Sequence, residues 1–534
     1  MKHFCKIVFL ISFICSGQQK NQNAIKNNNS TNAIYTNPIL HSDYSDPDVI
    51  RVGEDYYMTA SSFNCIPGLP ILHSKDLVNW QLVNYALKKQ PPFDVYKTVQ
   101  HGNGVWAPCI RYHNKEYYIF YPDPEFGIYM VKTNDPLGVW TEPVLIKEGK
   151  GIIDPTPLWD EDGKVYLAYA FAGSRAGIKS LLAICTLNSK TLLANNDDIM
   201  LLDGHDEEPT IEGPKLYKYN NYYYIFAPAG GVATGWQTVL RSKNIFGPYE
   251  KKKVMEQGNT TVNGPHQGAW IQTEAGEDWF IHFQDKGAYG RIVHLQPMTW
   301  EKGWPIIGED NNKDGIGQPV ISHKKPKVST QNNFIKSNGS DEFNEATLKL
   351  EWQWHANPEI YWGFPSTLGY YTMYCTPKPD HFINLYDASN LLLQKFPSET
   401  FTAITKVTFN ARHDGEQIGF LIMGLDYSYL KIERNNGNLF LSQVMCFDSD
   451  KKKAETETDK IKLLNNTVYL QAEIKTGEKV FFSYSMNNEE YFPIGKEFVA
   501  REGKWIGAKI GYLALRNNFT NDAGSVAIDW FRIK

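Results

Sequence analysis

The chain has 534 residues, with 54 lysines and arginines against 59 aspartates and glutamates, so its formal net charge is −5. This near balance excludes a dedicated nucleic-acid binder, which carries a basic excess on one face, and it argues against electrostatic adhesion to an anionic membrane. Aromatic residues make up 14 % of the chain, a share that suits both β-sheets and surfaces on which sugars stack.

The first residues are typical of an export signal. Two lysines accompany an apolar run over residues 7–15, which is too short for a membrane-spanning helix because such a helix needs about 20 apolar residues. We predict a signal peptide over residues 1–17, with lipid attachment at Cys15 as an alternative, and a disordered, Asn-rich spacer over residues 18–32. The protein is therefore expected to be exported, whether periplasmic, secreted or lipid-anchored, without a transmembrane helix.

Five cysteines lie beyond this segment. They are widely spaced and form no CxxC pair, which predicts buried free thiols rather than a disulfide framework or a metal site. The five are Cys65, Cys109, Cys185, Cys375 and Cys446.

A pattern of strand, tight turn and aromatic-rich strand recurs five times in the central part of the chain. The repeats follow one another at intervals of about 55 residues, and no stretch between them shows a long helical period. Units of this length have room for four strands each, so we predict a five-bladed β-propeller over residues 33–322. The residues that lead the five repeats are Asp46, Trp106, Asp154, Glu212 and His266.

Equivalent positions of propeller blades converge on the central axis, so three carboxylates are expected to share one axial pocket. Two separated carboxyl groups can cleave an acetal, one by protonating the leaving oxygen and the other by activating water or attacking carbon. A third carboxylate beside the acid would raise the pKa of that acid by like-charge repulsion. The same cluster could instead bind a hard metal cation, and the register alone favours glycoside cleavage only modestly over a metal site.

The repeats resemble glycoside hydrolase family 43, the β-xylosidases and α-L-arabinofuranosidases, whose fold is a five-bladed propeller. The resemblance spans about residues 35–320 and rests on the order and spacing of several stretches. These are SDPDVIRVGEDYYM around Asp46, SSFNCIPGLPILHSKDLVNW from Ser61, VWAPCIRYH around Trp106, IDPTPLW at Asp154, IEGPKLY at Glu212, GPHQGAW at His266 and YGRIVHLQPMTW at Arg291.

The resemblance implies a role for each of the three carboxylates. Asp46 would be the general base and Glu212 the general acid, and Asp154 would orient Glu212 and tune its pKa. Members of the family invert the anomeric configuration, which calls for a separation of roughly 6.5–9.5 Å between the acid and the base.

The resemblance also implies substrate-binding residues. Arg291 would hydrogen-bond the sugar in the −1 subsite, and Trp106 and Phe63 would form pocket walls. His266 would lie on the axis, near a calcium ion held largely by waters. No cofactor is expected to be required, and calcium would be structural.

The C-terminal third is predicted to be a second β domain. Residues 323–340 are polar and contain Pro, Gly and Lys, which is typical of a linker, and residues 341–534 show short strands without helices, which is typical of a β-sandwich. This part resembles the concanavalin-A-like jelly roll that follows the propeller in many family-43 xylosidases and lends a loop to the active-site rim. The corresponding stretch is poorly kept around residues 363–390, so a contribution to the pocket stays open, beside an independent sugar-binding role.

These observations predict an exported, exo-acting, inverting glycosidase that releases terminal β-D-xylose or α-L-arabinofuranose from hemicellulose fragments. Its partner would be an oligosaccharide or polysaccharide substrate. The main alternative is a non-catalytic sugar-binding propeller attached to a binding sandwich. A retaining enzyme on a five-bladed fold, such as a fructan hydrolase, is a second alternative, and its carboxylates would lie about 5–5.5 Å apart.

Overall fold

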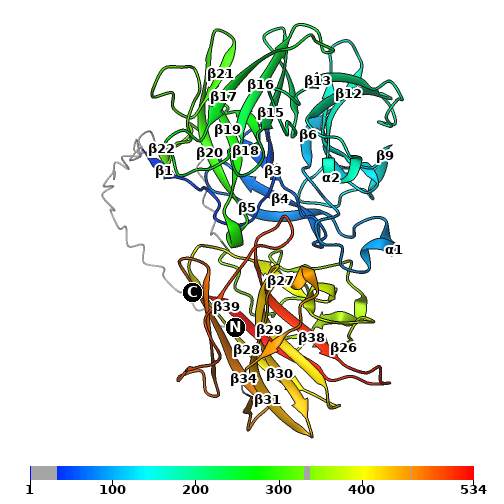
Figure 1. The fold of residues 1–534 in the computed structure, drawn as a ribbon, viewed down its shortest axis with the longest axis vertical. Coiled ribbons are helices and arrows are strands. Elements are labelled where there is room, and N and C mark those ends of the chain that lie inside the picture. The colour runs from blue at the N-terminus through cyan, green and yellow to red at the C-terminus, as the bar shows by residue number, and fades with distance from the viewer. Residues whose placement is uncertain (2–32, 330–336, 459) are drawn as a thin grey trace.

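The computed structural model describes Met1 and residues 33–329, 337–458 and 460–534. Apart from Met1, the predicted signal peptide and spacer lie outside the described residues, as does part of the predicted linker. The described chain is almost entirely β-structure and forms a five-bladed propeller followed by a two-sheet sandwich (Figure 1). The predicted fold class is confirmed.

Each propeller blade is a four-stranded antiparallel sheet whose strands follow one another in sequence order. Blade 1 contains β2 (Asp48–Val52), β3 (Asp55–Thr59), β4 (Gly68–Ser74) and β5 (Gln81–Leu87), and blade 2 contains β6 (Cys109–His113), β7 (Glu116–Asp123), β8 (Gly127–Thr133) and β9 (Val144–Glu148). Blade 3 contains β10 (Ile152–Trp159), β11 (Val165–Phe171), β12 (Leu181–Leu187) and β13 (Ile199–Asp203). Blade 4 contains β14 (Lys215–Tyr219), β15 (Tyr222–Ala229), β16 (Trp236–Ser242) and β17 (Glu250–Glu256), and blade 5 contains β18 (His266–Gln272), β19 (Asp278–Asp285), β20 (Arg291–Glu301) and β21 (Trp304–Ile307).

Tight turns join the first two strands of several blades. Asn114 and Lys115 between β6 and β7, and Asn220 and Asn221 between β14 and β15, all have positive φ. Two consecutive residues with positive φ are what a two-residue hairpin turn requires, and Asn adopts that conformation readily. The turns thus set the register between the two strands that they join.

The chain segments before and after the blades pair with each other. Strand β1 (Ile34–Thr36) runs antiparallel to β22 (Ser322–Lys324), and Leu40 bridges to Val293 of blade 5. The first two residues of the predicted linker therefore belong to β22. This pairing ties the beginning of the propeller to its end.

The sandwich consists of two sheets packed face to face around one core. The first sheet runs in the order β23 (Gln353–Trp354), β27 (Leu392–Lys395), β38 (Lys509–Arg516), β29 (Glu416–Met423), β30 (Tyr427–Asn435), β31 (Asn438–Cys446) and β32 (Thr456–Glu457), with β26 (Thr376–Pro377) beside β38 and β33 (Ile461–Lys462) beside β31. The second runs β24 (Gly363–Pro365), β25 (Tyr371–Tyr374), β39 (Ser525–Ile533), β28 (Phe401–Asn410), β34 (Thr467–Lys475), β35 (Lys479–Ser485) and β36 (Phe492–Pro493), with β37 (Phe498–Val499) beside β35.

Helices are few and short. They are α1 (Phe93–Tyr96), α2 (Gly173–Ala176), η1 (Gly287–Tyr289), η2 (Ile360–Trp362), η3 (Leu385–Asp387) and η4 (Ser449–Lys451). Within the described ranges, none of them has the length and apolar character needed to cross a membrane. The five cysteines beyond the predicted signal peptide are all buried and free, as the sequence predicts.

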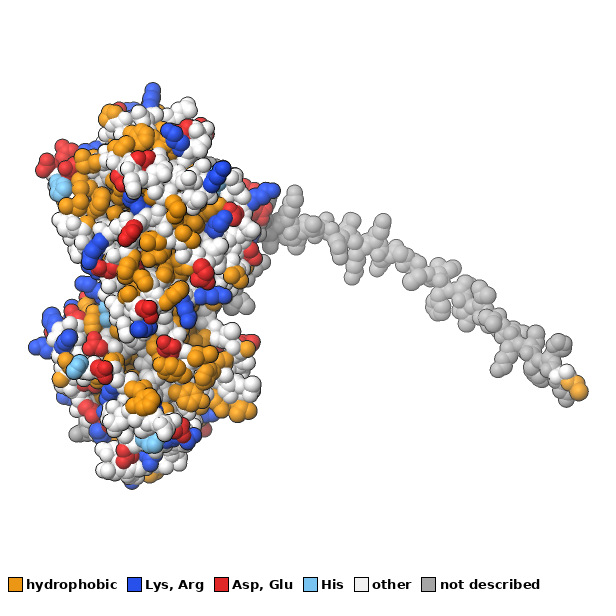
Figure 2. Space-filling view, turned by 90° about the vertical axis from the view of Figure 1, so that its right-hand side faces the viewer, with side chains coloured by type: hydrophobic (Ala, Val, Ile, Leu, Met, Phe, Trp, Pro, Cys, Tyr) orange, Lys and Arg blue, Asp and Glu red, His pale blue; other side chains and the backbone are white. Residues whose placement is uncertain are grey.

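The two domains form two lobes that contact each other (Figure 2). Ile66 of the propeller bridges to Trp354 of the sandwich, and the side-chain amide of Asn64 donates to the His355 carbonyl at 2.7 Å. The Lys509 ammonium lies 3.0 Å from Cys65 Sγ. Buried polar contacts of this kind fix the orientation of the sandwich on the propeller.

Candidate active site

The backbone bends sharply at the residues that lead the repeats. Asp46 and Asp154 both have positive φ, 54° and 57°, and both precede a proline. A following proline disfavours the right-handed helical region, and Asp is among the few residues that tolerate the left-handed one. The same conformation is taken by Gly213 after Glu212 and by Gln267 after His266. These bends direct the leading side chains into a common space.

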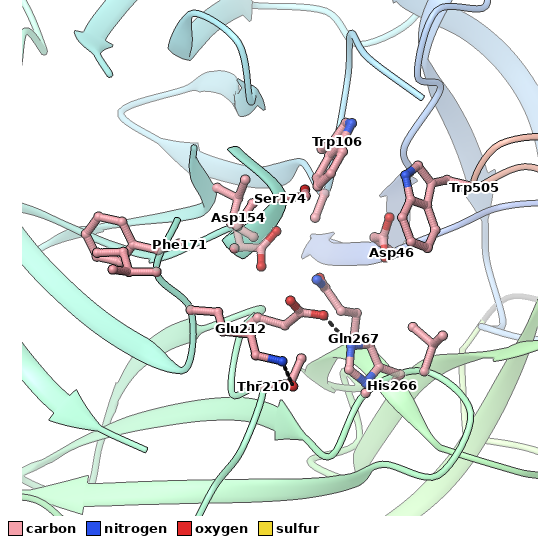
Figure 3. A pocket seen from close by; sticks show the side chains of 18 of the residues that line it. Asp46, Trp106, Asp154, Phe171, Ser174, Thr210, Glu212, His266, Gln267 and Trp505 are labelled. Atoms are coloured by element: carbon pink, nitrogen blue, oxygen red, sulfur yellow. Dashed lines mark hydrogen bonds and ion pairs between the residues drawn. The ribbon is translucent and has the colours of Figure 1, made fainter. Parts of the chain in front are cut away.

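That space is a cavity of about 630 Å³ on the propeller axis. The structure brings together every residue that the sequence assigns to the site, and Figure 3 shows the three carboxylates directed into the cavity. The seven predicted residues that line it are Asp46, Phe63, Trp106, Asp154, Glu212, His266 and Arg291.

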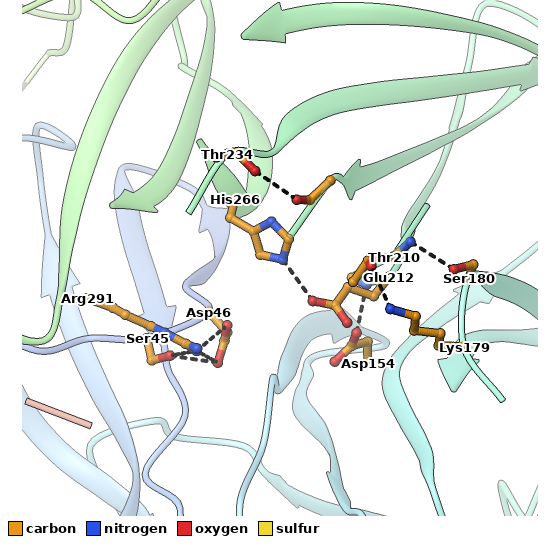
Figure 4. Close-up of polar contacts among 12 residues, drawn as sticks. Ser45, Asp46, Asp154, Lys179, Ser180, Thr210, Glu212, Thr234, His266 and Arg291 are labelled. Carbon is orange, nitrogen blue, oxygen red and sulfur yellow. Dashed lines mark hydrogen bonds and ion pairs between the residues drawn. The ribbon is translucent and has the colours of Figure 1, made fainter. Parts of the chain in front are cut away.

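Asp46 is held on one side of the cavity by serine and arginine side chains (Figure 4). Its Oδ2 accepts hydrogen bonds from the hydroxyls of Ser61 at 2.5 Å and Ser45 at 2.8 Å. Arg291 Nη1 lies 3.3 Å from Asp46 Oδ1 and donates to Ser45 Oγ at 2.6 Å. Asp46 is only 5 % exposed, and these contacts fix the orientation of its carboxylate.

Glu212 and Asp154 lie together on the other side. Glu212 Oε1 is 2.9 Å from His266 Nε2, and Asp154 Oδ2 accepts a hydrogen bond from the Gly213 amide at 2.7 Å. Asp154 is 1 % exposed, and its burial, together with the negative charge of Glu212, raises its pKa to about 8. Near neutral pH the Asp154 carboxyl is therefore largely protonated.

Aromatic side chains form the wall beside Asp46. The rings of Phe63 and Trp106 meet edge to face with centroids 6.4 Å apart, and the Trp106 and Trp505 rings do the same at 6.4 Å. Trp505 comes from the sandwich, so the second domain contributes to the cavity. Its contribution comes from the loop before β38 and not from residues 363–390, where the sequence analysis looked for it.

The loop that carries Trp505 is fastened to the propeller by a buried carboxylate. Asp43 Oδ2 accepts a hydrogen bond from the Gly507 amide at 3.0 Å, and its Oδ1 accepts one from the Arg291 amide at 2.9 Å. A Cβ on Gly507 would lie 2.8 Å from the Gly290 nitrogen, so the close approach of the two loops requires glycine. Asp43 thus positions Trp505 and Arg291 at once.

Sequence reasoning missed several residues on the side of Glu212 that faces away from Asp46. Phe171 and the segment from Ser174 to Lys179 line the cavity there, and Lys179 Nζ lies 3.4 Å from Thr210 Oγ1. Phe171 ends β11, and the others belong to the connection between β11 and β12, which has no counterpart in the repeat pattern, so periodicity could not identify them. Ser45 and Ser61, in contrast, stand inside or beside quoted motifs and could have been chosen as partners of Asp46.

The calcium expectation concerns the surroundings of His266. No group of three or more His, Cys, Asp or Glu side chains within the described ranges is arranged to hold a metal ion. His266 Nδ1 and Gln267 Oε1 are buried and have no hydrogen-bond partner among the described residues. These two atoms suit contact with waters around an ion rather than direct ligation by several carboxylates.

Comparisons with known proteins agree with this geometry. Residues 35–305 match the model of glycosyl hydrolases family 43, and residues 340–534 match that of the β-xylosidase C-terminal concanavalin A-like domain. A protein of Xylanibacter ruminicola is 36 % identical over 487 residues, which cover 90 % of this chain and 86 % of that protein.

Two further relatives carry names of glycosidases. A β-xylosidase of Formosa agariphila is 29 % identical, with 93 % of this chain and 90 % of that protein covered, and a non-reducing end α-L-arabinofuranosidase of Bacteroides ovatus is 28 % identical, with 75 % and 76 % covered. The crystal structure of a family-43 protein of Bacillus licheniformis superposes with a TM-score of 0.81 at 26 % identity, covering 94 % of this chain and 99 % of that one. The comparisons favour an enzyme over the non-catalytic propeller and over a fructan hydrolase.

Proposed function

Since the chain belongs to glycosyl hydrolases family 43 and is therefore a glycosidase, we propose that it releases a terminal pentose, β-D-xylose or α-L-arabinofuranose, from hemicellulose fragments. The names of its relatives, a β-xylosidase and a non-reducing end α-L-arabinofuranosidase, support this substrate class. The two sugars present similar hydroxyl geometry, so both belong to the proposal.

The observation that carries the proposal is the division of the carboxylates between two sides of one cavity. Asp46 lies with Arg291 and the two serines, whereas Glu212 lies with Asp154 and His266 (Figure 4). A sugar ring between the two sides would have its scissile bond next to Glu212 and a water next to Asp46. Two carboxyl groups that flank the scissile bond are what glycoside hydrolysis requires, and a water held between the sugar and Asp46 would give inversion.

The proposed reaction is a single displacement. The water oxygen attacks the anomeric carbon while Asp46 accepts a proton from the water. At the same time Glu212 gives its proton to the glycosidic oxygen as the bond between that oxygen and the anomeric carbon breaks. Asp154 keeps a proton available to Glu212 until the glycosidic bond breaks. Arg291 and the aromatic wall of Phe63, Trp106 and Trp505 would hold the sugar in place.

The test is turnover of aryl β-D-xylopyranoside and aryl α-L-arabinofuranoside by purified protein, with Asp46→Asn alongside. We expect turnover that the substitution lowers by several orders of magnitude, and the ratio of the two rates names the preferred sugar. Release of the opposite anomer, followed by NMR, checks inversion. Folded protein that turns over neither substrate would refute the pentose assignment.

Two further expectations from the sequence belong to the same proposal. Export directed by residues 1–17 is checked by finding the mature protein in the envelope or the medium. A Cys15→Ser variant that no longer associates with the membrane would identify a lipid anchor at Cys15. A structural calcium ion near His266 is checked by metal analysis of purified protein and by the effect of calcium on the melting temperature.

A further inference from the structure

A second cavity, of about 560 Å³, lies between the propeller and the sandwich. It shares no lining residue with the active-site cavity. Its volume falls within the range of small-molecule sites, and such sites occur preferentially at domain interfaces. The residues that bear on its chemistry are Tyr44, Trp80 and Tyr85 from the propeller and Glu351, Gln394 and Lys395 from the sandwich.

A buried amide without a partner faces this cavity. Gln394 is 2 % exposed, and its Nε2 has no hydrogen-bond partner among the described residues. Tyr44 and Tyr85, which are 9 % and 7 % exposed, line the same cavity. Nearly all buried polar groups in proteins are hydrogen-bonded. The unpartnered Gln394 amide therefore indicates that a hydrogen-bonding atom of a ligand or of water belongs in the cavity.

The charged groups of the cavity offset each other. Lys395 Nζ lies 3.8 Å from the centroid of the Tyr44 ring, and burial lowers the pKa of Lys395 to about 8. Burial raises the pKa of both Tyr44 and Tyr85, and the negative charge of the nearby Glu351 carboxylate raises both further. Neither Lys395 nor Glu351 forms an ion pair with another residue in the described part of the chain. Lys349 and Glu345 also line the cavity, so its charges are two cations and two anions. This balance favours a ligand without net charge.

We propose that this interdomain cavity is a second binding site for a neutral, hydroxyl-rich ligand of one or two sugar rings. The rings of Tyr44, Trp80 and Tyr85 offer apolar surface for the C–H faces of a sugar. The two phenols, Gln394 and the Lys395–Glu351 pair offer donors and acceptors for its hydroxyls. The choice of a pentose as occupant rests on the proposed function, because the product of the active site is then the sugar at hand.

The test counts the D-xylose molecules bound per chain by equilibrium dialysis. We expect two in the wild type, one in Leu82→Trp, which fills the second cavity with a larger side chain, and one in Arg291→Ala, which removes the sugar partner of the active site. Tyr85→Phe keeps the shape of the cavity and should weaken the second site about 5-fold by removing one hydrogen bond. Tyr129→Phe, at a buried tyrosine outside both cavities, is the matched control and should leave both sites unchanged.

The outcomes separate the two proposals. Aryl glycoside turnover by Leu82→Trp and Tyr85→Phe should stay within about 2-fold of wild type, which also shows that the variants fold. A single xylose per wild-type chain, or a second site that both substitutions leave intact, would overturn the second site. Wild-type protein that turns over neither aryl glycoside, and whose xylose binding Arg291→Ala leaves unchanged, would instead count against the pentosidase assignment.

Discussion

Replacing Asp154 by Asn should stabilise the protein at neutral pH while lowering its activity. The carboxyl has a pKa of about 8 in the folded protein against a usual value near 3.8. The folded state thus binds this proton more tightly than the unfolded chain. The associated stability is present in full below pH 4 and is lost as the pH rises to 8.

The structure sets the size of the effect. At pH 7 the carboxyl is about 3 pH units above its usual pKa, which corresponds to a penalty of about 4 kcal/mol at most. Asn carries no charge at any pH, and its carbonyl oxygen can still accept the hydrogen bond from the Gly213 amide. The variant should therefore melt several degrees above the wild type at pH 7, since 1 kcal/mol corresponds to about 2–4 °C in a large domain.

The assay is thermal unfolding of wild type and Asp154→Asn between pH 5 and pH 8. The difference in melting temperature should widen as the pH rises. Asp206→Asn, at an exposed aspartate of the same domain, is the control and should show no such trend. A difference that stays constant over this range, or a variant that is less stable at every pH, would refute the reasoning.

Activity provides a second measurement on the same variant. Wild-type kcat/KM should fall as the pH rises through about 8, because the Asp154–Glu212 pair then loses the proton that the leaving group needs. In Asp154→Asn the acid has no second carboxylate beside it, so this limb should move to lower pH. An unchanged limb would remove Asp154 from the proton-holding role.

Other substitutions test the remaining contacts of the site. Glu212→Gln should abolish activity on glycosides with poor leaving groups while sparing activated aryl glycosides, which need less protonation; equal losses on both would contradict the acid role. Ser61→Ala removes the short hydrogen bond to Asp46 and should lower kcat about 10- to 100-fold. A variant in which only KM rises would contradict a role of Ser61 in holding the base. Trp505→Ala should lower kcat/KM about 10-fold by removing an aromatic wall. Asp43→Asn should also lower kcat/KM about 10-fold by releasing the loop that carries Trp505. In the Trp505→Ala background the same substitution should lower kcat/KM by less than it does alone. Strictly additive losses would show that Asp43 does not act through Trp505.

The propeller and its carboxylates could be predicted because their information is local. Each repeat carries its own hairpin turn, and the bends at Asp46 and Asp154 both occur at an Asp that precedes a Pro. Equal registers of a repeated unit must meet on the axis. The sequence by itself therefore determined the fold class and the convergence of the three acids.

The rest of the site depends on contacts between residues far apart in the chain. Asp43 and Gly507 are separated by 464 positions, and Trp505 reaches the cavity only because the sandwich is docked on the propeller. No periodicity or motif encodes such a meeting, since it is set by the packing of two complete domains. The place of Trp505 in the aromatic wall, the contact of Asp43 with the Arg291 amide and the interdomain cavity were therefore decided by the tertiary structure alone.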